Sequence, residues 1–138
     1  MNNQMNNQPP IKPPNEKFLW VAFLGAIFMY SVVAIIISQT GEGFVELDSE
    51  MLAVLFYAFL FLSIIQLFIL FRWSSKVEHK PIETLPENKK NLFMIKYALA
   101  EAMAIYGVVL FLMNGNSSHL LLFSGLAVVG MLLSYPKK

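Results

Sequence analysis

Two long runs without a charged side chain constrain this chain more than any other feature. They read FLWVAFLGAIFMYSVVAIIIS at residues 18–38 and MLAVLFYAFLFLSIIQLFILF at residues 51–71. A helix needs roughly 20 mostly apolar residues to cross about 30 Å of hydrocarbon. The whole chain is 57% hydrophobic and 14% charged, whereas a typical globular domain has about 25% charged residues. The runs therefore predict two transmembrane helices.

Two further apolar stretches follow in the second half of the chain. The first covers residues 92–113, and the polar turn NGNSSH leads from it into a second at residues 120–135. The last stretch is a little short for a full span, which local thinning of the bilayer can accommodate. The sequence thus predicts an all-α integral membrane protein with four transmembrane helices, arranged as two hairpins.

Polar segments complete the organisation. Residues 1–17 are poor in apolar side chains and rich in Asn, Gln and Pro, so they are expected to form a disordered tail. Residues 72–91 contain five bases and two prolines and are expected to form one long aqueous loop. The sequence lacks the basic start and small-residue cleavage site of a secretory signal. Residues 136–138 form a short polar end.

The basic residues predict the orientation of the helices. Lysine and arginine occur before the first span, within residues 72–91 and at the very end of the chain, and the other two connectors contain neither. Basic connectors stay on the cytoplasmic side of a membrane. Both termini and the long loop are therefore expected to be cytoplasmic, in a multi-pass protein of the plasma membrane.

Several kinds of chemistry lack the residues they need. Cysteine is absent, which excludes disulfides and thiolate metal sites. The two histidines, His79 in the long loop and His119 at the outer end of the fourth helix, are expected to be solvent-exposed on opposite sides of the membrane, so they cannot share a metal. No phosphate-binding loop or nucleophile motif is present, and a net charge of +1 does not favour nucleic acid. We expect no enzyme activity, cofactor or metal.

One acid interrupts the third apolar stretch. In MIKYALAEAMAIYGVVLF, Lys96 lies about one turn from the expected cytoplasmic edge, so its long side chain can carry the ammonium to the headgroups. Glu101 lies near the middle of the span, where an ionised carboxylate costs about 2.5 to 3.5 kcal/mol on insertion scales. The protonated form is cheaper, and Glu101 is expected to point into the bundle as a neutral hydrogen-bond donor.

The expected surroundings of Glu101 follow from depth and helical spacing. Hydroxyl side chains at compatible depths are its candidate hydrogen-bond partners: Tyr30, Ser31, Ser63 and Ser124. Small side chains let transmembrane helices approach closely. Those expected to pack the third helix against the fourth are Ala98, Ala104, Gly107, Ala127, Gly130 and Ser134.

The segment EAMAIYGVVLFL at residues 101–112 resembles the carboxylate-bearing helix of the rotary ATP synthase c subunit, the proteolipid. The resemblance implies that Glu101 is an ion-carrying carboxylate. It also implies that Tyr106 helps to orient this carboxylate, with Gly107 following. The resemblance does not extend beyond these residues.

Two functions remain open. The first is a small non-enzymatic membrane protein that acts through helix packing with itself or with a larger membrane partner, since its aqueous segments are too small for a catalytic domain. The second is a proton- or cation-responsive or translocating membrane protein that uses Glu101. An intramembrane acid favours the second, whereas the lack of other acids or histidines for a relay favours the first.

Overall fold

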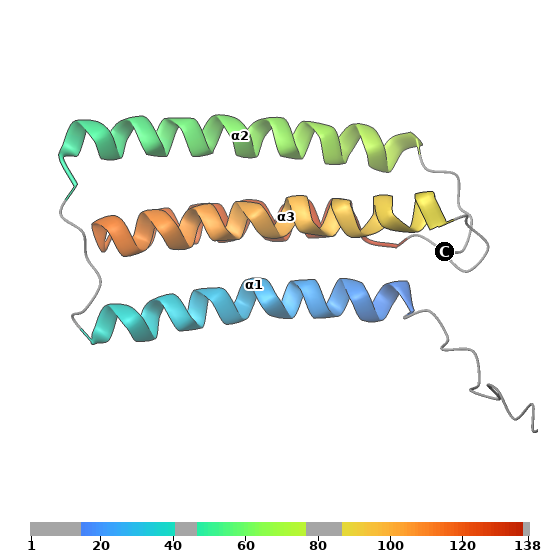
Figure 1. Cartoon of the computed structure of the whole chain (residues 1–138), viewed down its shortest axis with the longest axis horizontal. Helices are drawn as coiled ribbons and strands as arrows, with labels where there is room; N and C mark the ends of the chain where they lie inside the picture. The colour runs from blue at the N-terminus through green and yellow to red at the C-terminus, as the bar shows by residue number, and fades with distance from the viewer. Residues whose placement is uncertain (1–14, 41–46, 77–86, 137–138) are drawn as a thin grey trace, which may run out of the picture.

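The computed structural model describes residues 15–40, 47–76 and 87–136, and these form four helices (Figure 1). They are α1 (Glu16–Gln39), α2 (Ser49–Lys76), α3 (Glu87–Asn114) and α4 (Ser117–Leu133). The predicted all-helical class is confirmed. Three segments are long and apolar enough to cross a membrane: Glu16–Gln39, Ser49–Trp73 and Asn91–Asn114. α4 is apolar but shorter, with 17 residues.

The helix ends follow from local hydrogen bonding. The side chain of Asn15 caps α1 by accepting from the backbone N–H of Lys17, and Asn116 caps α4 by accepting from that of Ser118 at 2.9 Å. Both satisfy a donor that a helix start leaves unpaired. Gly115 has φ of 69°, a left-handed conformation that glycine adopts without steric cost. This residue permits the tight reversal from α3 into α4.

The observed helix bounds differ from the predicted ones. α1, α2 and α3 contain the expected spans and extend beyond them, while α4 lies at 117–133 instead of 120–135. Both ends of the predicted loop at 72–91 are helical, because α2 continues to Lys76 and α3 begins at Glu87. Residues 77–86 lie outside the described part of the chain. Residues 1–14 of the predicted tail also lie outside it, and Glu16 already belongs to α1. The predicted bounds followed the apolar residues, whereas the backbone hydrogen bonds of a helix continue into the polar residues on either side.

α3 and α4 form the centre of the bundle, with α1 and α2 on either side of them. In Figure 1, α2 and α1 flank α3, and α4 lies behind α3. α3 contacts all three other helices, while α1 and α2 make hardly any contact with each other. The predicted hairpin of α3 and α4 is present, whereas the helices of the other predicted hairpin are separated by this central pair. Consecutive helices alternate in direction, so the start of α1 lies near the end of α4.

The buried residues follow this arrangement. Most of them come from α3 and α4, including Tyr97, Met103, Phe123 and Met131, and each of these four is fully buried. Large apolar side chains on α1 and α2 are mostly exposed, as with Phe28, which is 71% exposed. A helix that is apolar on all sides is typical of a membrane span.

Candidate functional site

Glu101 and Tyr30 form a hydrogen bond between α3 and α1. The Tyr30 hydroxyl donates to Oε1 of Glu101 at 2.6 Å. Both residues lie near the middle of segments apolar enough to cross a membrane. Among the described residues, Tyr30 is the hydrogen-bond partner of the Glu101 carboxyl. Tyr30 is the one of the four predicted hydroxyl partners that contacts it.

This pair lies at the edge of the bundle. Tyr30 is 37% exposed and Glu101 is partly exposed, so Glu101 lies in the seam between α1 and α3 and not in the centre of the bundle. Ala100 and Ala104 occupy the buried face of α3. Successive residues differ by about 100° around a helix, which turns Glu101 away from α4 and toward the seam with α1.

The three predicted serine partners lie elsewhere. The Oγ atoms of Ser31 and Ser124 are 3.1 Å apart and share a hydrogen bond between α1 and α4. Ser31 also donates to the carbonyl of Ile27 in its own helix. Ser63 is fully buried, and its hydroxyl has no hydrogen-bond partner among the described residues. Ser31 and Ser124 thus tie α1 to α4 beside the Tyr30–Glu101 pair.

Tyr106 does not lie beside Glu101, contrary to the role implied by the resemblance. Its hydroxyl accepts a hydrogen bond from Nε2 of Gln66 at 3.0 Å, and its ring stacks on Phe59 with centroids 4.8 Å apart. Tyr106 is five residues after Glu101, which places it on another face of α3, toward α2. Sequence reasoning missed Gln66. Its signal was an amide side chain within the mostly apolar run at 51–71.

Most of the predicted packing residues do bring α3 and α4 together. Ala104, Gly107, Ala127, Gly130 and Ser134 are buried. A Cβ atom at Gly107 would lie 2.7 Å from the Cβ of Phe123, closer than real Cβ contacts come. Ala98 is exposed, so its assignment to this packed face is wrong.

Lys96 is buried instead of extending to the headgroups. It is 6% exposed, and its ammonium lies 5.3 Å from the centre of the Phe93 ring. The carboxylate of Glu16 at the start of α1 interacts electrostatically with it. This opposite charge explains how a lysine can be held inside the end of the bundle. The sequence reading missed Glu16 because it assigned residues 1–17 to a tail.

His119 lies at the expected end of the fourth helix, but it is not the solvent-exposed residue that was predicted. It lies in the first turn of α4, partly buried, with its ring 4.8 Å from that of Phe56 on α2. Its Nδ1 atom is buried without a hydrogen-bond partner in the described chain. His79 lies outside the described residues. Among those that the structure describes, no three acids or histidines are close enough to hold a metal.

No family model matches the chain, and neither curated proteins nor solved structures give a match. The resemblance of residues 101–112 to the c subunit therefore stays a prediction. The residues themselves supply a carboxyl and a phenol that share a hydrogen bond at the outer edge of an apolar bundle. Such an arrangement can form further hydrogen bonds with another molecule.

Proposed function

We propose that this chain is a small, non-enzymatic integral membrane protein that associates laterally with another membrane-embedded surface. Three helices have the length and composition of membrane spans. α4 packs closely on α3, so it enters the bilayer with it. The distribution of basic residues supports cytoplasmic termini in a plasma membrane.

The observation that carries the proposal is the partly exposed Tyr30–Glu101 pair at mid-span. A neutral carboxyl has one O–H donor and acceptor capacity on both oxygens, and a tyrosine hydroxyl can accept as well as donate. Tyr30 satisfies one acceptor site of Glu101. Lipid chains cannot satisfy the remaining sites, and unpaired polar groups in hydrocarbon are costly. Contact with a polar group on another helix would remove this cost.

The neighbours of Glu101 favour such a contact. Ala98, three residues earlier, and Ile105, four residues later, are exposed on the same side of α3. We call Tyr30, Ala98, Glu101 and Ile105 the lateral face. The small side chain of Ala98 would let another helix approach α3 closely. A second copy of this chain and a larger membrane protein are both partners of the right kind.

Cross-linking tests the proposal cleanly because the chain contains no cysteine. A single cysteine at Ala98, modified with the photoreactive reagent benzophenone maleimide, should give cross-linked species in native membranes with either kind of partner, because the photoreactive group needs no thiol on the partner. A cysteine at Ile64, which is 56% exposed on α2, serves as the matched control and should give far less. Combining Ala98→Cys with Glu101→Leu should abolish the product, and Glu101→Gln should preserve it because glutamine keeps a donor and an acceptor.

Equal cross-linking at the two positions, or a product that survives Glu101→Leu undiminished, would overturn lateral association through this face. A protein that carbonate washing removes from the membrane fraction would overturn the membrane assignment itself. The two failures have different readouts.

A second candidate function is a proton- or cation-responsive membrane protein. The observation that favours it is the partial exposure of the Glu101 carboxyl, since a group sealed in the core could not exchange protons or ions. The test is ion or proton flux into vesicles containing the purified protein. Flux that Glu101→Gln abolishes would support this function, and wild-type flux equal to that of empty vesicles would exclude it.

A further inference from the structure

Two polar side chains on the inward face of α2 have hydrogen-bonding atoms without a partner. Ser63 is fully buried, and its Oγ atom has no hydrogen-bond partner among the described residues. The same holds for the buried Oε1 atom of Gln66, which lies three residues later on the same side of the helix. Unpaired buried polar atoms are rare in native proteins, and each calls for an explanation such as a bound water or ion.

Tyr106 brings a third polar group to the same place. Its ring stacks on that of Phe59 with centroids 4.8 Å apart, and its hydroxyl accepts a hydrogen bond from Nε2 of Gln66 at 3.0 Å. The side chain of Tyr106 thus extends along α2 from Phe59 to Gln66. Ser63 lies between these two residues on the same face, at the spacing of helical neighbours. The three polar side chains therefore converge between α2 and α3, near the middle of both apolar spans.

The donors and acceptors of this cluster match one water molecule. The hydroxyls of Ser63 and Tyr106 each have a proton to donate, and Oε1 of Gln66 has lone pairs that can accept. A water molecule can accept two hydrogen bonds and donate two, and buried waters typically make about three. A cation fits less well, because these three side chains are neutral and a buried charge is costly without an opposite charge.

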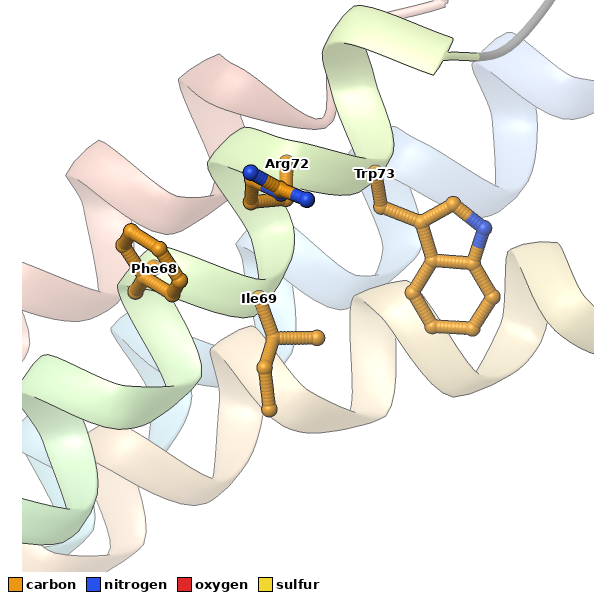
Figure 2. A pocket seen from close by; sticks show the side chains of 4 residues that line it. All are labelled: Phe68, Ile69, Arg72 and Trp73. Atoms are coloured by element: carbon orange, nitrogen blue, oxygen red, sulfur yellow. The ribbon is translucent and has the colours of Figure 1, made fainter.

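The open surface of α2 has a different character. Figure 2 shows the four side chains that border a groove near the end of this helix: Phe68, Ile69, Arg72 and Trp73. The lining of the groove is almost wholly apolar, so it gives a polar ligand hardly any atom to bond. Ser63 and Gln66 lie instead where α3 packs on α2, and there protein surrounds the polar atoms.

We propose that the interior of the bundle between α2 and α3 binds one water molecule. The water accepts hydrogen bonds from the hydroxyls of Ser63 and Tyr106 and donates one to Oε1 of Gln66. It links α2 to α3 at a depth where most neighbouring side chains are apolar. The site lies within one chain and on the side of α3 that faces α2, so it is independent of association through the lateral face.

Solid-state NMR of the purified full-length protein in perdeuterated lipid tests the proposal through magnetisation transfer from water. The reporter is the side-chain amide of Gln66, isotope-labelled as one of four glutamines and assigned by correlation with its own backbone. The wild type should show transfer from water to this amide. Ser63→Ala removes one partner of the water and should reduce the transfer severalfold. Ser124→Ala should leave it unchanged, because the hydroxyl of Ser124 is paired with that of Ser31.

Absence of transfer to Gln66 in the wild type would overturn the proposal, and so would equal transfer in the wild type and in Ser63→Ala. A second measurement distinguishes water from a cation. The chemical shift of the side-chain carbonyl carbon of Gln66 should be the same in sodium, potassium and salt-free buffers. A shift that changes with one of these cations would assign the site to a metal ion instead. Both wild-type measurements hold whether or not a variant folds.

Discussion

At the scale of single residues, the hydrogen bond from Tyr30 to Glu101 joins two helices at a place where water is not expected. Its 2.6 Å length is typical of a strong O–H···O bond. The pair also lies beside Ser31 and Ser124, which link α1 to α4. Together these contacts give α1 a polar attachment to both central helices, in addition to its apolar packing.

Replacing Tyr30 by phenylalanine should weaken this attachment. The substitution removes the hydroxyl that donates to Glu101 and keeps the ring. Interhelical hydrogen bonds in membrane proteins contribute about 0.6 kcal/mol on average and at most about 1.7, so we expect a loss of stability within this range. Reversible unfolding in mixed detergent micelles measures it. Tyr57→Phe, at a 67% exposed position on α2, is the control, and an equal loss there would contradict the assigned bond.

The chemistry of this site could be predicted from the sequence better than its geometry. A carboxyl within an apolar stretch indicated a polar contact at Glu101, and Tyr30 was among the candidates by depth. Depth alone could not separate Tyr30 from Ser63, because the choice depends on how each helix is rotated about its axis. The same ambiguity misplaced Ala98, which lies three residues from Glu101 but outside the packed face.

At the scale of the helices, the close packing of α3 on α4 organises the bundle. Two glycines make this possible in different ways. At Gly107 the nearest atom to an added Cβ is the Cβ of Phe123, at the root of a side chain. At Gly130 the nearest is Cε of Met103, the flexible end of a side chain, at 2.8 Å. The first contact fixes the separation of the helix backbones, and the second can adapt.

Alanine substitutions should therefore differ in effect. Gly107→Ala should destabilise the bundle by about 1 to 3 kcal/mol, the usual cost of overpacking, while Gly130→Ala should cost less because Met103 can move. Gly25→Ala is the control, since nothing lies within 4 Å of its added Cβ. It should be neutral or stabilise the helix by up to about 1 kcal/mol through its helix propensity. Equal losses at Gly107 and Gly25 in detergent unfolding would contradict the packing described.

The existence of the helices was predictable, and their ends and partners were less so. Long apolar runs identified α1, α2 and α3, because few alternatives can accommodate such composition. Their polar extensions, such as the turn of α1 that begins at Glu16, carry no apolar signal. The separation of α1 from α2 could not be predicted either, since a connection in sequence does not fix which helices share a contact.

At the scale of the whole molecule, the four helices alternate in direction, so the ends of the described chain lie at one end of the bundle (Figure 1). Trp20 near the start of α1 donates a hydrogen bond to the carbonyl of Met131 near the end of α4 at 2.7 Å. Its ring also packs edge-on against Tyr135. These contacts tie the first and last helices together at the end that basic residues predict to be cytoplasmic.

Cysteine labelling from one side tests this orientation. Lys17 lies at the start of α1 and Ser49 at the start of α2, and both are exposed. With the proposed topology, an impermeant maleimide should label Ser49→Cys in intact cells and Lys17→Cys only after the cells are opened. The absence of native cysteine makes each signal specific. Labelling of both positions from the same side would contradict the alternating arrangement in the membrane.

The central claim is that the carboxyl of Glu101, held by the Tyr30 hydroxyl, is the hydrogen-bonding group of the proposed lateral face. Infrared spectroscopy of the protein in nanodiscs, with Glu101→Gln to assign the band, measures this most directly. We predict that the frequency of the Glu101 carboxyl band shifts in Tyr30→Phe, because that variant loses the donor at Oε1. A Glu101 band at the same frequency in the wild type and in Tyr30→Phe would show that the Tyr30 hydroxyl does not donate to this carboxyl, and would contradict the account.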